Sequence, residues 1–148
     1  MISPELLRHY GCFGSVADET LKAVAMIAEQ VSVPAETQVF REKDPADALR
    51  IIVEGEVDLQ CALDRHAVRT IDTLITGDLL GWSAMVEPYR MTTSAISRKP
   101  TRLIRIDAKA LRELCTRDHW LGYQLMQGIA SCLTERLEAA RVQLGTKA

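Results

Sequence analysis

The feature that most constrains the fold of this 148-residue chain is a run in which apolar residues occupy every second position. The apolar members are Val57, Leu59, Cys61 and Leu63, which alternate with Glu56, Asp58, Gln60 and Ala62. Successive side chains of a strand point to opposite faces, so this pattern predicts a half-buried strand.

Shorter segments with strand character recur on both sides of this run. Turn residues separate them, among them Gly55, Gly77-Asp78 and Lys99-Pro100. The predicted strands cover residues 37–41, 49–53, 57–63, 68–74, 92–97 and 101–106. Short strands at this regular spacing indicate a compact antiparallel roll or sandwich and not a parallel α/β sheet.

Helical patterns lie at both ends of the chain. Ser3-Pro4-Glu5 predicts the start of a helix that runs to Tyr10, and helical spacing predicts a second helix over residues 17–30. Asp107 is expected to cap a third segment. A long helix over residues 120–144 would carry an apolar stripe of Leu121, Leu125, Ile129, Leu133, Leu137, Ala140 and Leu144.

Together these patterns predict one domain over residues 1–148. With 47% hydrophobic residues, the chain has enough apolar side chains for one ordinary core. The expected class is α+β, mainly β. It would be an antiparallel double-stranded β-helix, a jelly-roll-like β-roll, flanked by N-terminal helices and a long C-terminal helix.

Composition argues against several function classes. The net charge of -2 lacks the basic field that nucleic-acid binding usually needs. We find neither a membrane-length apolar run nor a secretory leader, and therefore expect a cytoplasmic protein. His9, His66 and His119 are too scattered for a metal site, and no nucleophile motif indicates an enzyme. The cysteines are expected to be buried reduced thiols, except for Cys12, which we expect to be more reactive.

Three motifs carry a family resemblance. They are Leu49 to Gly55, then Gly77-Asp78-Leu79-Leu80-Gly81, then Ser83-Ala84-Met85. With the order of helices and strands, they resemble the cyclic-nucleotide-binding domain of catabolite activators, kinase regulatory subunits and gated channels. The resemblance covers nearly the whole chain. The chain departs from the family pattern at Lys43, where a glycine is usual.

The resemblance implies a phosphate-binding cassette after Gly81. Backbone N–H groups at Gly81, Ser83 and Ala84 would face a cyclic phosphate. In the family, an acid just after the glycine holds the ribose and an arginine about ten positions on pairs with the phosphate. Here those positions hold Trp82 and Met91. Losing both charged groups would cost roughly 3–6 kcal/mol, or about 10²–10⁴ in affinity. Binding of cAMP or cGMP is therefore disfavoured, and we expect no cofactor.

The candidate pocket leaves alternatives open. Its members are Gly81, Trp82, Ser83, Ala84, Arg90, Met91, Thr92 and Arg136. Trp82 could stack on a flat ligand, although a cavity plug is favoured. Arg90 should point away from the pocket unless a bulge turns it inward. Arg136 is either a pocket cation or part of a solvated helix face with Glu135 and Glu138.

The long helix suggests how the domain acts. Activators of the resembling family place a winged helix-turn-helix after this helix, whereas only Thr146-Lys147-Ala148 follow Gly145 here. We therefore expect no direct DNA binding. Apolar residues in the second half of the helix predict a homodimer. The first hypothesis is a non-enzymatic regulatory domain with a degenerate or retuned cassette that acts through dimerisation and a protein partner. The alternative is a receptor for a cyclic nucleotide or another small anion.

Overall fold

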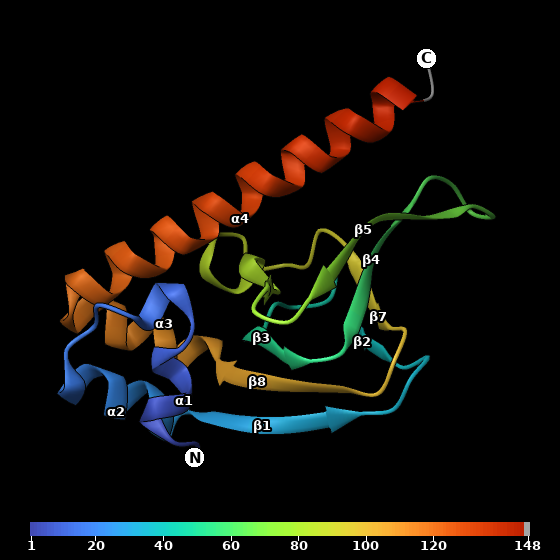
Figure 1. Cartoon of the computed structure of the whole chain (residues 1–148). Coiled ribbons are helices and arrows are strands. Elements are labelled where there is room, and N and C mark those ends of the chain that lie inside the picture. The colour runs from blue at the N-terminus through green and yellow to red at the C-terminus, as the bar shows by residue number, and fades with distance from the viewer. Residues whose placement is uncertain (147–148) are drawn as a thin grey trace.

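Two four-stranded antiparallel sheets and a set of helices make up the fold of residues 1–146, which a computed structural model describes (Figure 1). The helices are α1 (Pro4–Arg8), the 3-10 helix η1 (Gly11–Phe13), α2 (Asp18–Met26), the 3-10 helix η2 (Trp82–Met85), α3 (Ala108–Arg117) and α4 (His119–Thr146). The strands are β1 (Ala28–Val33), β2 (Gln38–Phe40), β3 (Ala48–Glu54), β4 (Glu56–Ala62), β5 (Val68–Ile75), β6 (Leu79–Leu80), β7 (Ser94–Ser97) and β8 (Thr101–Asp107).

The antiparallel roll between N-terminal helices and a long C-terminal helix is confirmed. One sheet has the strand order β1-β8-β3-β6 and the other has the order β2-β7-β4-β5. The alternating run forms β4, in which Val57 and Leu59 are buried, while Leu63 lies beyond the strand and is exposed. The predicted alternation therefore holds up to the hairpin that joins β4 to β5.

The prediction of one helix over residues 17–30 is wrong in its second half. Helix α2 ends at Met26, and the chain continues as β1. Ala28 to Val33 pair along their length with Ile106 to Thr101 of β8. Ala, Glu and Gln favour a helix, but the backbone hydrogen bonds of this ladder outweigh that weak local preference.

Strand β3 separates the two parts of the core. Leu49 and Ile51 belong to a cluster that α1, α2, α3 and α4 cover, whereas Ile52 belongs to the cluster inside the roll. Side chains alternate along a strand, so Arg50 shares the inner face with Ile52. A charged side chain thus points into a largely apolar interior.

Helix α4 crosses one side of the roll as a long rod (Figure 1). It continues two residues past the predicted end at Leu144. The last two residues, on which the expectation of no attached DNA-binding domain depended, lie outside the described residues. Within residues 1–146, no helix has both the length and the apolar character that a membrane span needs.

Candidate functional site

The turn after β6 forms the cassette that the sequence suggests. Gly81 has a φ of 75°, a left-handed conformation that favours glycine, and η2 follows at once. A Cβ at this position would lie 3.0 Å from the carbonyl oxygen of Ala48. Glycine is therefore needed for both its torsion and its close approach to β3. The backbone N–H of Ala84 donates to the carbonyl of Gly81, which closes the first turn of η2. The expectation that this N–H group faces a phosphate is therefore wrong.

Four of the candidate residues that follow Gly81 come together in the structure. Ser83 and Ala84 are buried in η2, and Met91 is buried against the cassette. The Cε of Met91 lies 3.4 Å from the point that a Gly81 Cβ would occupy. Trp82 is half-buried and packs against both core clusters. Apolar side chains therefore stand at the positions where the resembling family places its acid and its arginine.

The structure does not bring Arg90 and Thr92 to the cassette. Both are exposed, and Nη1 of Arg90 donates to the carbonyl of Lys43 at 3.1 Å. Arg90 also forms an isolated bridge with Pro45, which ties this segment to the loop before β3. The cassette residues do not fit a cyclic nucleotide held by an acid and an arginine from this segment.

A residue that sequence reasoning missed lies beside Gly81. Arg50 is only 9% exposed, and its Nη1 lies 3.8 Å from the point that a Gly81 Cβ would occupy. Its Nη1 donates to the carbonyl of Ala48 at 3.4 Å, and its Cζ lies 5.7 Å from the centre of the Phe40 ring. Burial lowers the pKa of Arg50. The negative charge of Asp47 opposes this change, and the positive charge of Arg105 adds to it. The alternation of side chains along β3 places Arg50 inside the roll, and this pattern could have identified Arg50 from the sequence.

A second arginine fixes the outer side of the cassette. Nη1 of Arg112 in α3 donates to the carbonyl of Ala84, and the guanidinium carbon lies 4.0 Å from the centre of the Tyr89 ring. A guanidinium that binds a backbone carbonyl and stacks on an aromatic ring holds η2 against α3. This arginine has a structural role that follows from its partners.

Arg136 faces the roll and not a solvated helix surface. Its Nε lies 2.6 Å from Oδ2 of Asp72 on β5, and both side chains are largely buried. The two atoms are not aligned as a hydrogen bond, and Nη1 of Arg136 is also buried without a hydrogen-bond partner in residues 1–146. Glu135 is a more distant partner at 3.5 Å. The pair connects α4 to β5, but some buried polar atoms of both side chains remain without a hydrogen bond.

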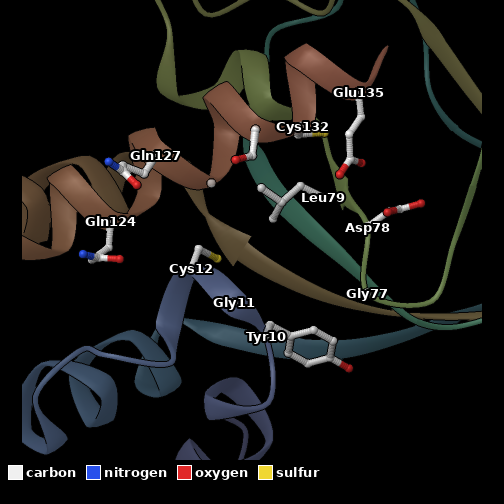
Figure 2. Close-up of a pocket in the computed structure, with 12 residues that line it drawn as sticks. Tyr10, Gly11, Cys12, Gly77, Asp78, Leu79, Gln124, Gln127, Cys132 and Glu135 are labelled. Atoms are coloured by element: carbon white, nitrogen blue, oxygen red, sulfur yellow. The ribbon is translucent and has the colours of Figure 1, made fainter. Parts of the chain in front are cut away.

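A cavity of about 390 Å³ lies apart from the cassette, between η1, the β5–β6 turn and α4 (Figure 2). Its lining includes Cys12 and Cys132, and the carboxylates of Asp78 and Glu135 lie together at one end. Burial raises the pKa of the Cys12 thiol to about 12. The expectation that Cys12 is the reactive cysteine is therefore wrong, because its buried thiol does not ionise near neutral pH. Within residues 1–146, no three metal-binding side chains gather.

The predicted apolar stripe of α4 divides into two faces. Leu121, Leu125 and Ile129 are buried against the roll and the N-terminal helices, whereas Leu133, Leu137 and Leu144 are exposed. The exposed residues continue a second stripe, which we call the outer seam: Tyr123, Met126, Ala130, Leu133, Leu137, Ala140 and Leu144. All seven members of the outer seam are exposed. One helix therefore presents an apolar face to the roll and another to solvent.

Known proteins show the same architecture. A family model of the cyclic nucleotide-binding domain matches residues 30–118. The chain is 37% identical to a putative cyclic nucleotide-binding protein of Geobacter metallireducens, whose solved structure has a TM-score of 0.83 and covers 93% of this chain and 99% of its own. The Thermus thermophilus catabolite activator protein, at 22% identity and a TM-score of 0.70 over 97% of this chain and 62% of its own, shares the fold.

A curated relative is the CRP-like cAMP-activated global transcriptional regulator of Mycobacterium tuberculosis. It is 28% identical over 130 residues, which is 85% of this chain, and the chain spans 56% of that regulator's length. The family model covers more than half of the chain, including β3 and the cassette. This chain belongs to the cyclic nucleotide-binding domain family.

Proposed function

We propose that this chain is a non-enzymatic regulatory domain that acts in the cytoplasm as a homodimer through the outer seam of α4. The observation that carries the proposal is the exposure of apolar residues along most of a helix. Leu137 and Leu144 are 57% and 72% exposed. Contiguous apolar surface of this kind is typical of a binding face.

The spacing of the outer seam favours a second copy of the same helix as its occupant. From Tyr123 to Leu144 the members follow steps of three and four residues in strict alternation. This is the a/d pattern of a coiled coil, in which each helix buries its seam against an equivalent seam. A two-fold axis through α4 makes such a surface complementary to itself. A further protein partner would then bind the homodimer.

The cassette supports a regulatory role that differs from ordinary cyclic-nucleotide sensing. Trp82 and Met91 occupy the two positions where charged side chains would recognise a ribose and a cyclic phosphate. Met91 offers no N–H or O–H donor and Trp82 offers a single indole N–H, so together they replace few of the hydrogen bonds that the ligand makes in water. We therefore infer weak binding of cAMP and cGMP.

Two experiments test the two parts of this proposal. Sedimentation equilibrium at tens of micromolar should give a mass near twice the monomer's 16.5 kDa. Millimolar cAMP or cGMP should leave the melting temperature unchanged. The Trp82→Glu, Met91→Arg double variant should gain a ligand-dependent shift. A monomeric mass would refute the dimer, and a clear shift of the wild-type protein by cAMP would refute the inference about the cassette.

A second candidate function is a receptor for a small anion other than a cyclic nucleotide. The specific observation in its favour is Arg50, a buried cation directly beside Gly81. The donors of such a site would come from the guanidinium of Arg50, because the N–H of Ala84 already donates to the carbonyl of Gly81.

A further inference from the structure

The cavity beside α4 is lined by two carboxylates and by no basic side chain. It measures about 390 Å³, at the lower end of the range for small-molecule pockets in proteins. Asp78 of the β5–β6 turn and Glu135 of α4 lie together at one end of it (Figure 2). Among the described residues that line the cavity, none is a lysine, an arginine or a histidine. The cavity is therefore a recess of negative charge.

Neither carboxylate has a close cation of its own. Asp78 forms no ion pair within residues 1–146, and its Oδ2 accepts a hydrogen bond from the backbone N–H of Ile75 at 2.8 Å. Glu135 lies 3.5 Å from Nη2 of Arg136. That guanidinium is nearer to Asp72, because its Nε lies 2.6 Å from Oδ2 of Asp72. Two like charges that lie together without a close cation favour a positively charged ligand.

A buried thiol without a partner lines the same end of the cavity. Cys132 is only 8% exposed and lies one helical turn before Glu135, and its thiol forms no hydrogen bond in the part of the chain that the structure describes. Its sulfur can accept a weak hydrogen bond, for which the protein supplies no donor. Burial raises the pKa of this thiol to about 11, the charge of Arg136 lowers it, and the charges of Asp78 and Glu135 raise it further. The negative potential of the two carboxylates therefore reaches the wall of the cavity.

The cavity extends along α4 away from the carboxylates. Its lining continues to Gln127 and Gln124 at the opposite end (Figure 2), and the helix rises by about 16 Å from Gln124 to Glu135. Nε2 of Gln127 donates to the hydroxyl of Tyr123 at 2.6 Å, which leaves its carbonyl oxygen to accept. Between the two ends, Leu79 presents an apolar side chain to the cavity. A chain of methylene groups with an amino group at each end matches this order of surfaces.

We propose that this cavity binds an aliphatic diamine or polyamine, one of whose ammonium groups lies between Asp78 and Glu135. An ammonium group carries three N–H donors and no acceptor, so it can donate to both carboxylates at once. Hydrogen bonds between charged partners are short and strong. The methylene chain would pack on Leu79, and a second amino group would donate to the amide carbonyls at the far end. The inference goes beyond the proposed function, because no residue that lines the cavity belongs to the outer seam or to the cassette.

The test titrates putrescine and spermidine into the whole chain by calorimetry, in about 0.15 M sodium chloride to screen distant charges. A neutral diol of the same length as putrescine and magnesium chloride are the ligand controls. Both amines should bind the wild type, and neither control should. Asp78→Asn and Glu135→Gln should each weaken amine binding about 10- to 100-fold. Glu138→Gln removes an exposed acid of the same helix outside the cavity, and it should bind like the wild type.

Four outcomes would overturn the inference. The first is a wild type that binds neither amine. The second is equal affinity in Glu135→Gln and Glu138→Gln, which indicates general attraction to an acidic protein; both positions are exposed, so folding does not confuse this comparison. The third is magnesium that displaces spermidine, because the site would then hold an inorganic cation. The fourth is equal binding of the neutral diol. The dimer and the cassette are judged separately by their own experiments.

Discussion

Replacing Leu137 by glutamate should weaken the proposed dimer strongly. Leu137 is 57% exposed in the single chain, and full burial of a leucine contributes roughly 1.5–3 kcal/mol. Burying the exposed part on both helices is therefore worth about 1.7–3.4 kcal/mol, which corresponds to roughly a 20- to 300-fold change in Kd. Two glutamates facing each other across the axis would add repulsion to this loss.

Sedimentation equilibrium over a range of micromolar concentrations measures this change. The matched control is Val142→Glu, because Val142 is 64% exposed on the same helix but lies outside the outer seam. The control should dimerise like the wild type, and circular dichroism should show equal helix content in both variants. Equal dissociation constants for Leu137→Glu and the wild type would refute the reasoning from helical spacing.

Three further predictions concern stability. Gly55→Ala should lower the free energy of unfolding by about 2–4 kcal/mol in urea titrations, because Gly55 has a φ of 121° and its Cβ would meet Oγ1 of Thr101 at 2.3 Å. Asp72→Leu should cost about 2–3 kcal/mol because it leaves the buried Arg136 with only the exposed carboxylate of Glu135 as a partner, and adding Arg136→Met should restore most of the loss. Above pH 9 the free energy of unfolding should fall, because the pKa of Cys12 is raised from 9.0 to about 12 in the folded protein and the thiol ionises first in the unfolded chain. Denaturation curves measured at several pH values should show that Cys12→Ala reduces the dependence of this free energy on pH.

Patterns that depend on local geometry were predictable from the sequence. The alternation in β4 and the glycines at the turns follow from strand and turn geometry, which neighbouring residues determine. Strand β1 could not be predicted in this way. Its backbone groups are satisfied by β8, about 75 residues further along the chain, and no local pattern reports such a partner.

The candidate site was predictable only in its backbone. The sequence motif predicts the glycine turn and η2. It does not predict that a guanidinium from β3, that of Arg50, lies beside the turn. Arg50 is not predicted as a site residue, because a charged side chain within a strand is usually directed to solvent. Likewise, the partner of Arg136 is Asp72, which the chain brings to α4 from a distant strand. Contacts between elements, and not residue spacing, decide where these charges lie.

The two faces of α4 have a mechanical consequence. An α-helix advances about 100° per residue, so the inner and outer faces of one unbroken rod cannot move independently. If the contacts of Ile129 and its neighbours with the roll shifted by a single residue, Leu137 would rotate by about that angle away from the two-fold axis of the proposed dimer. In the proposed dimer, a small rearrangement beneath the helix would therefore produce a large change in how the two copies are oriented, with no hinge required.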